Sequence, residues 1–236
     1  MDRRFTGRFQ AAIILLTFVA SSAVGCAWFQ SQREKSAREL ATEGMAEYED
    51  GDYLDAIKIF TTLKEHYPYS RYAVLAELKL ADAHFYREDY EEAIAAYDQF
   101  ARLHPKNEAI PYVLYQIGES YFRQIYTFDR DQTPTHQSIQ AFERLLSAFP
   151  ESAYDAKARE KIHKCRLELA DHEIYVGNFY LKSKKYRAAL ARFEGALKQY
   201  ADVLEGAKRQ KVEQSIKLCK EKLALQESAM TETPKK

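Results

Sequence analysis

Catalysis or metal binding would require histidine, cysteine or carboxylate side chains grouped at short, regular spacings. The chain of 236 residues has three cysteines and six histidines. No two histidines stand at the His-x-x-x-His spacing that places two zinc ligands on one helix face. The sequence also has no glycine-rich phosphate loop and no Gly-x-Ser-x-Gly turn for a serine nucleophile. We therefore expect no enzymatic activity, no metal and no cofactor.

One cysteine is a candidate for covalent modification because of the segment that precedes it. Arg3, Arg4 and Arg8 lead into an apolar run over residues 11–20. A basic start, and an apolar run shorter than the ~20 residues of a membrane span, are typical of an export signal. The junction Ala23-Val24-Gly25-Cys26 resembles a bacterial lipobox. That resemblance implies cleavage before Cys26 and a covalent lipid on its thiol.

The predicted N-terminal organisation is a signal peptide over residues 1–25 and a lipidated linker over residues 26–30. Ala27 follows the cysteine where an aspartate would favour retention in the inner membrane, so the resemblance implies transfer to the outer membrane. Several acyl chains together make a stable anchor. The alternative is ordinary secretion with Cys26 as an incidental thiol.

A spacing of residues recurs four times along the remaining chain, at relative offsets of 0, 4, 7 and 12. Offsets of 4 and 7 lie on one face of a helix, and a proline at the last offset ends that helix. Small residues stand 12 positions before three of these series, at Gly44, Ala81 and Gly177. The series are Ala56-Phe60-Leu63-Pro68, Ala93-Tyr97-Phe100-Pro105, Ser138-Phe142-Leu145-Pro150 and Ala189-Phe193-Ala196-Ala201.

Small residues on two successive helices let them pack closely, which is the tetratricopeptide (TPR) pattern of helical hairpins. We predict an all-α protein, a TPR-type α-solenoid of about four and a half to five repeats over residues 31–226. The aromatic residues of the second helices, Phe60, Tyr97, Phe142 and Phe193, should form the core. Helices are expected over residues 31–50, 53–67, 71–87, 90–104, 108–124, 138–149, 152–182, 186–200 and 203–226.

Two segments depart from this regular pattern. Gly118 and Ser138 are 20 residues apart instead of 12, so residues 126–137, which include Pro134, are predicted to form a long loop. Whether that loop contacts a partner or only the solenoid is left open. The polar residues 227–236 are predicted to be a disordered tail.

Cys165 and Cys219 are expected to be free and mostly buried. If the first helices of neighbouring repeats are parallel, Cys219 lies level with position 185. That position is about 20 residues, or roughly 30 Å, from Cys165, whereas a disulfide needs Cα atoms within about 7 Å.

Charge is distributed unevenly along the chain. Residues 26–180 hold 18 basic and 27 acidic side chains, and residues 181–236 hold 14 basic and 7 acidic ones. The near-neutral total argues against nucleic-acid binding. The asymmetry indicates either solvated helix faces or two docking surfaces of opposite sign. On the second interpretation, Lys184, Lys185 and Arg187 are candidate partner contacts at the basic end.

The segments between the repeats resemble those of the BamD family, the TPR lipoproteins of the outer-membrane β-barrel assembly (BAM) complex. The similar segments are Tyr67-Pro68-Tyr69-Ser70-Arg71-Tyr72-Ala73, Arg102-Leu103-His104-Pro105, Asp129-Arg130-Asp131-Gln132 and Phe149-Pro150-Glu151-Ser152-Ala153-Tyr154. The resemblance covers about residues 26–205. Ala201 stands where the family has a proline, and the chain has one terminal helix where some relatives have two.

This resemblance implies a lipid-anchored, non-catalytic scaffold on the periplasmic face of the outer membrane of a Gram-negative bacterium. It implies binding to POTRA domains of a BamA-like protein, to other BAM lipoproteins and to unfolded outer-membrane proteins. Candidate groove residues on the first helices are Tyr48, Phe85, Tyr86, Tyr115 and Phe122. Aromatic side chains of this kind suit peptide contacts, although the same rings could simply pack helix on helix. The alternative function is that of another periplasmic TPR lipoprotein, of the pilus- or secretin-assembly type.

Overall fold

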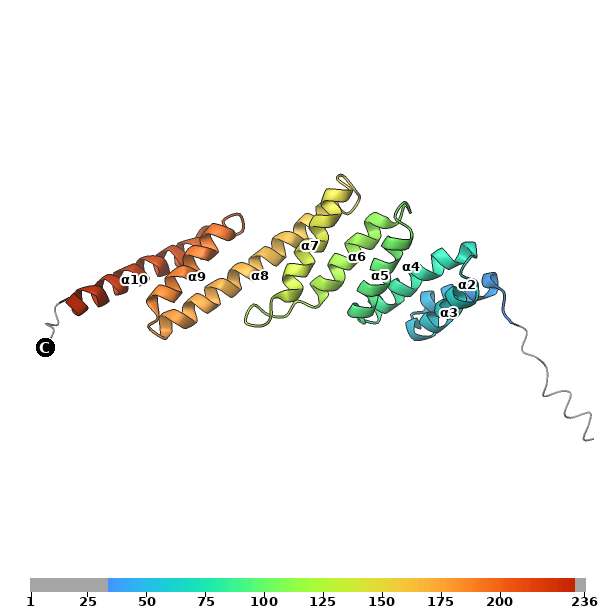
Figure 1. Cartoon of the computed structure of the whole chain (residues 1–236), viewed down its shortest axis with the longest axis horizontal. Helices are drawn as coiled ribbons and strands as arrows, with labels where there is room; N and C mark the ends of the chain where they lie inside the picture. Colours follow the sequence, from blue (N-terminus) through green and yellow to red (C-terminus); the bar gives the residue numbers. More distant parts are fainter. Residues whose placement is uncertain (1–33, 232–236) are drawn as a thin grey trace, which may run out of the picture.

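The computed structural model describes residues 34–231 as an elongated stack of helices (Figure 1). The predictions for the signal peptide, the lipidated linker and Cys26 lie outside the described residues. The helices are α2 (Ala37–Asp50), α3 (Tyr53–His66), α4 (Arg71–Tyr86), α5 (Tyr90–Leu103), α6 (Ile110–Arg123), α7 (Thr133–Ala148), α8 (Asp155–Lys182), α9 (Tyr186–Gln199) and α10 (Gly206–Thr231). Each helix packs against the next one in the sequence. The predicted all-α TPR-type solenoid is confirmed.

In three hairpins, a glycine of the first helix faces a phenylalanine ring of the second helix. A Cβ atom added to Gly44 would lie 2.7 Å from the ring of Phe60, and one added to Gly118 would lie 2.6 Å from the ring of Phe142. Gly177 meets Phe193 in the same way. Real Cβ contacts are longer than this, so the helices approach to a distance that only glycine permits. The predicted register between first and second helices is therefore confirmed.

The core follows from this register. Phe60, Tyr97, Phe142 and Phe193 are all fully buried, as predicted. Each comes from the second helix of a hairpin, and together with leucine and alanine side chains they form clusters that succeed one another along the stack. Such a core is continuous along the rod but thin, since each hairpin buries its apolar face only against its neighbours.

Three hairpin turns have the same backbone geometry. Gly51, Glu88 and Lys184 adopt left-handed conformations with φ of 85°, 67° and 57°. In each turn the next residue donates its N–H to a carbonyl five residues back, as from Asp89 to His84 at 3.0 Å and from Lys185 to Tyr180 at 2.9 Å. These bonds satisfy carbonyl groups that the helix end leaves free.

The junctions between hairpins also repeat. The residue directly after each second helix donates its N–H to a carbonyl four residues back, as His104 does to Phe100 at 2.9 Å. Tyr200 makes the same bond to Ala196 at 3.0 Å, although Ala201 replaces the proline of the other repeats. The fourth repeat therefore ends with the same backbone hydrogen bond as the others.

Several predicted boundaries need correction. The first helix begins at Ala37 instead of residue 31, because Ser36 caps it in a capping box with Glu39. The long helix begins at Asp155 instead of residue 152. The last helix spans Gly206–Thr231, so it starts later than predicted and continues five residues into the segment predicted to be disordered.

The inserted loop is shorter than predicted. Helix α7 begins at Thr133, so residues 133–137 are helical and the loop comprises residues 124–132. Pro134 lies in the first turn of α7, where its missing N–H is not needed. At the start of the helix, the Asp131 carboxylate accepts a hydrogen bond from the Thr133 N–H at 3.1 Å. Pro134, which was predicted to lie in the loop, therefore lies in the first turn of a helix.

Candidate functional site

An aromatic cluster lies at the turn end of the first two hairpins. Three of the predicted groove residues, Tyr48, Phe85 and Tyr86, are close together, with ring centroids 6.0 Å apart for Tyr48 and Tyr86 and 5.6 Å apart for Phe85 and Tyr86. Tyr53 stacks on Tyr86 at 5.4 Å, and Tyr90 contacts Phe85 at 5.7 Å. We call Tyr48, Tyr53, Phe85, Tyr86 and Tyr90 the aromatic cluster.

The cluster is partly open to solvent and accepts a cation. Tyr86 is 50% exposed. The Lys79 ammonium lies 4.6 Å above the ring of Tyr48, a favourable arrangement with the electron-rich ring face. Burial, followed by the nearby Asp82 carboxylate, raises the pKa of Tyr48. The Tyr48 hydroxyl therefore stays neutral, and the cluster presents flat, amphipathic faces for contact.

A buried carboxylate, that of Asp82, links side chains from several helices beneath the aromatic cluster. Asp82 is 1% exposed and accepts hydrogen bonds from the hydroxyls of Tyr97 at 2.7 Å and Tyr112 at 2.8 Å. Lys79 adds a charged hydrogen bond at 2.8 Å. Burial and the Asp82 charge raise the pKa values of Tyr97 and Tyr112. Since the three helices α4, α5 and α6 all contribute, this network holds consecutive repeats in a fixed relation.

A second buried carboxylate occupies the equivalent position one repeat later. Glu119 follows Gly118 as Asp82 follows Ala81. Its oxygens pair with Arg123 at 2.8 Å and with Lys161 of α8 at 2.6 Å. Lys161 also lies 3.9 Å above the ring of Phe122. Phe122 is thus covered by a lysine of the next repeat and does not join the aromatic cluster.

Tyr115 is also separate from the aromatic cluster. Its ring contacts Phe142 at 5.6 Å and stacks on Tyr154 at 5.1 Å. These partners belong to α7 and to the junction that leads into α8. For Tyr115 and Phe122 the geometry therefore favours the interpretation that the rings pack helix on helix. The predicted groove residues did not include Tyr53 and Tyr90. Each is the first residue of a second helix, directly after a hairpin turn.

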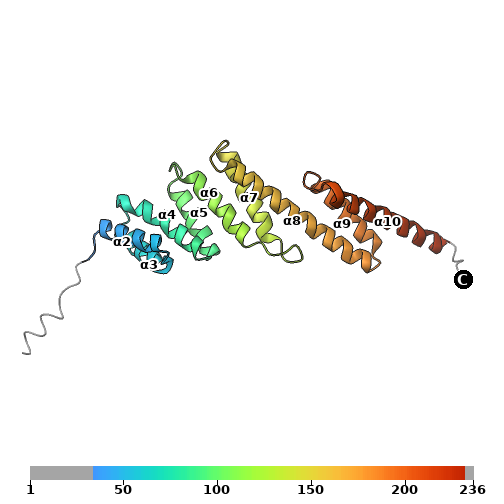
Figure 2. The ribbon, with the colours of Figure 1, turned by 180° about the vertical axis from the view of Figure 1, so that it is seen from behind.

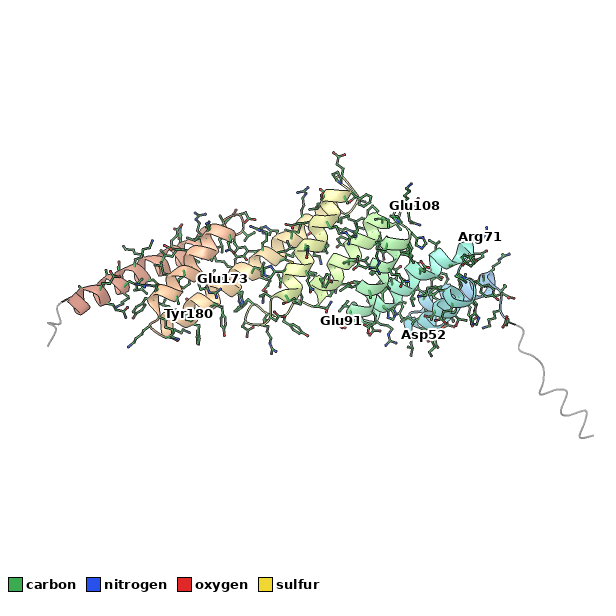
Figure 3. All side chains as sticks on the ribbon, viewed as in Figure 1. Asp52, Arg71, Glu91, Glu108, Glu173 and Tyr180 are labelled. Atoms are coloured by element: carbon green, nitrogen blue, oxygen red, sulfur yellow. The ribbon has the colours of Figure 1, made fainter. Side chains whose placement is uncertain are left out.

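The basic end is a turn between α8 and α9. Lys184, Lys185 and Arg187 are exposed there, and within the described residues no carboxylate pairs with any of them. Lys185 lies 6.0 Å from the ring of Tyr180. Figure 3 shows Tyr180 near this turn, on the same long edge as Asp52 and Glu91, while Arg71 and Glu108 mark the opposite edge. The aromatic cluster and the basic end therefore share one edge of the rod.

The other candidate chemical groups of the described helices are the two cysteines. Cys165 and Cys219 are buried and not joined to one another. The Cys165 thiol contacts the Ser138 hydroxyl at 3.6 Å, and burial raises its pKa to about 11. In the part of the chain that the structure describes, no group of three histidine, cysteine or acidic side chains is arranged to hold a metal ion. Within the same part, none of the helices has the length and apolar character needed to cross a bilayer.

Comparisons with known proteins agree with this architecture. The family model described as "YfiO: Outer membrane lipoprotein" matches residues 33–234. The outer membrane protein assembly factor BamD of Caulobacter vibrioides is 31% identical over 205 residues, which cover 85% of this chain and 67% of that protein. BamD of Neisseria meningitidis serogroup B is 30% identical over 181 residues, covering 72% of this chain and 68% of that protein.

Another curated relative and a solved structure are also similar to this chain. BamD of Pasteurella multocida is 28% identical over 200 residues, covering 79% of this chain and 76% of that protein. Among solved structures, a tetratricopeptide repeat protein from Parabacteroides merdae aligns at a TM-score of 0.41 and 12% identity, over 80% of this chain and 86% of that one. From the family match and the curated relatives together, the chain belongs to the YfiO family of outer membrane lipoproteins, the BamD-type outer membrane protein assembly factors.

Proposed function

We propose that this chain is a non-catalytic scaffold, anchored by lipid on Cys26 to the periplasmic face of the outer membrane. In this role it binds POTRA domains of a BamA-like protein together with other BAM lipoproteins, and it receives unfolded outer-membrane proteins for insertion. The family membership supports assembly as the general task. The lipobox-like junction supports the anchor.

The aromatic cluster is the observation that carries the substrate part of this proposal. It offers a half-exposed tyrosine, Tyr86, with a rigid floor fixed by Asp82. An unfolded β-barrel strand alternates apolar and polar side chains, so its aromatic residues can stack on such rings while its backbone stays extended. Tyr48 and Phe85 belong to the same surface. Tyr115 and Phe122 contribute through the packing that holds the neighbouring repeat in place.

The basic end supports the part of the proposal that concerns binding to a partner protein. Lys184, Lys185 and Arg187 lack carboxylate partners within the described chain, and unpaired surface cations favour an acidic partner surface. Exposed cations contribute more to the rate and orientation of association than to affinity. We therefore assign them to orienting a folded partner of the POTRA type.

Site-specific photo-crosslinking tests the substrate surface directly. A photoreactive phenylalanine analogue replaces Tyr86 in one variant and Tyr69 in the matched control, since Tyr69 is fully exposed but lies at the α3–α4 junction. Each variant is mixed with an outer-membrane β-barrel protein diluted from urea, and with the same protein already folded in detergent. Crosslinks from position 86 to the unfolded form alone are expected. Equal crosslinking from positions 86 and 69 would contradict the proposal.

A further inference from the structure

The two long edges of the rod differ in charge over the first two hairpins. Figures 1 and 2 both show the junctions between hairpins along one edge and the turns within hairpins along the other. The turns are acidic, since residues 47–55 hold five acidic and no basic side chains and residues 87–92 hold four acidic and one basic. The first two junctions, residues 64–72 and 102–108, each hold two basic and one acidic side chain. We call these two junctions the junction edge.

The chain enters the rod at the junction edge. The Tyr67 hydroxyl donates a hydrogen bond to the Lys35 carbonyl at 2.8 Å, so the residues directly before α2 lie beside the first junction. Cys26 precedes Lys35 by nine positions, and nine residues span at most about 30 Å when fully extended. A lipid on Cys26 would therefore hold the first junction close to the bilayer surface. The turns lie farther away by the length of a helix, about 24 Å for the 16 residues of α4.

The side chains exposed on the junction edge are of the kinds found where membrane meets water. Tyr69 is fully exposed in the first junction, and Leu103 is 56% exposed in the second. The Arg71 guanidinium lies 4.9 Å from the ring centroid of Tyr72 and donates a hydrogen bond to its hydroxyl at 2.8 Å. Tyrosine rings favour the head-group level of a bilayer, and arginine binds phosphate groups. The first junction thus combines an open ring with an arginine beside it.

The residue after each junction proline changes in character along the rod. It is Tyr69 in the first junction, Lys106 in the second and Glu151 in the third, and all three are exposed. Lysine is attracted to a surface of anionic lipid, whereas glutamate is repelled from it. The third junction, residues 149–155, holds two acidic and no basic side chains. The features that suit a bilayer are therefore confined to the end of the rod nearest Cys26.

We propose that the junction edge lies against the surface of the bilayer to which Cys26 is anchored. Tyr69 then lies among the lipid head groups, and Arg71 and Lys106 face lipid phosphates. The anchor makes these weak contacts intramolecular, so a few side chains suffice to orient the rod. The acidic turns, together with the aromatic cluster, point away from the bilayer. The proposal rests on the lipid anchor put forward above and adds to it the orientation of the rod.

Fluorescence quenching by labelled lipid measures which edge faces the bilayer. The lipidated chain, purified from membranes, is reconstituted into vesicles of phosphatidylethanolamine and phosphatidylglycerol that contain a phospholipid with a nitroxide head group. A fluorophore is attached to the cysteine of a Glu108→Cys variant or of a Glu91→Cys variant, the matched control on the opposite edge (Figure 3). Both glutamates are exposed, and Cys165 and Cys219 are buried away from the reagent.

Stronger quenching is expected at position 108. The two labels are separated by about the length of α5, which is roughly 21 Å for its 14 residues, so quenching at position 108 should exceed that at position 91 by about threefold or more. Flotation of the vesicles is measured on the same samples. A chain that floats with the vesicles but shows equal quenching at both positions would overturn the proposed orientation alone. A chain that does not float would overturn the anchor as well.

A double variant tests the named contacts. Tyr69→Ser with Lys106→Glu should reduce quenching at position 108 to the level at position 91. Tyr126→Ser with Lys184→Glu is the matched control, because it also removes an exposed ring and reverses one exposed charge, and it should leave the difference unchanged. All four side chains are on the surface, so the thermal unfolding of both variants should match. Undiminished quenching in the Tyr69→Ser, Lys106→Glu variant would overturn the proposal.

An acidic partner protein is the competing occupant of the junction edge. The vesicles contain no other protein, so lipid quenching at position 108 assigns the edge to the bilayer. A label at position 108 that lipid does not quench in vesicles, but that is shielded from iodide in the assembly complex isolated from membranes, would assign the edge to a partner and overturn the proposal.

Discussion

Gly177 in α8 lies so close to Phe193 in α9 that a Cβ atom at the glycine would stand 2.7 Å from the ring. The same relation joins Gly44 to Phe60 and Gly118 to Phe142. In these three hairpins, the distance between the two helices therefore depends on a contact between a glycine and a ring. Because these contacts repeat, they offer a direct way to test the register of the solenoid.

Replacing Gly177 by alanine should lower the free energy of unfolding by about 1–3 kcal/mol, because the added methyl group overpacks the contact with Phe193. Urea denaturation followed by circular dichroism measures the change. Gly195→Ala is the matched control, since nothing lies within 4 Å of a Cβ at that helical glycine. The control should gain about 0.5–1 kcal/mol through higher helix propensity. A loss of similar size at both positions would contradict the close-approach explanation.

Removing the Asp82 carboxylate should destabilise the chain by about 3–5 kcal/mol, as expected when one partner of a buried charged network is deleted. Asp82→Ala leaves the hydroxyls of Tyr97 and Tyr112 without their acceptor. Asp98→Ala is the control, because its pair with Arg144 is longer, 3.4 Å, and exposed, and it should cost no more than about 0.5 kcal/mol. Chemical denaturation of both variants would give the comparison. Equal effects would show that Asp82 does not organise the floor beneath the aromatic cluster.

Stability should fall steeply at alkaline pH. Burial raises the pKa of Tyr97 well above 10.0 and that of the Cys165 thiol from 9.0 to about 11. The unfolded chain therefore releases these protons at a lower pH than the folded chain, so the stabilisation is complete below about pH 9 and is lost as the pH rises.

Each such group contributes a slope of up to about 1.4 kcal/mol per pH unit above its unfolded pKa. Urea unfolding at pH 8, 9.5 and 10.5 measures this slope. Cys165→Ala should reduce it by one group between pH 9 and 11. Cys26→Ala supplies the control, as residue 26 lies outside the residues that the structure describes. An identical slope in the Cys165→Ala variant would contradict the assigned thiol contribution.

Cys26→Ser should abolish lipid attachment, because the thiol is the acceptor in the lipobox-like junction. Metabolic labelling with a radioactive fatty acid, followed by immunoprecipitation, measures lipid attachment. The variant should accumulate in the soluble fraction, while Cys165→Ser, which alters a buried thiol, should be labelled normally. Continued labelling of the Cys26→Ser variant would favour ordinary secretion, with the cysteine as an incidental thiol.

Much of the fold could be predicted because its determinants are local and periodic. The small residues and the aromatic residues that follow them define which helices pair, as Gly44 and Phe60 illustrate. Helix ends were less predictable, since they depend on single hydrogen bonds such as the one that the Thr133 N–H at the start of α7 donates to the Asp131 carboxylate. Pro134 fits either a loop or a first helical turn, and the residue type alone does not decide between them.

The candidate site was predictable only in part. Tyr48, Phe85 and Tyr86 follow from the inner face of first helices, but Tyr53 belongs to the cluster because a turn brings the next helix beside them. The charge difference between the two edges of the rod was not predicted, because acidic turns and basic junctions alternate along the sequence.

Isolation of the tagged full chain from detergent-solubilised outer membranes of its own cells tests the central claim most directly. We predict that mass spectrometry will identify a stoichiometric outer-membrane protein with POTRA domains, together with further lipoproteins, and that Lys184→Glu with Lys185→Glu and Arg187→Glu will reduce its recovery at low salt. Recovery of a secretin or pilus-assembly protein in place of a POTRA protein would contradict the account.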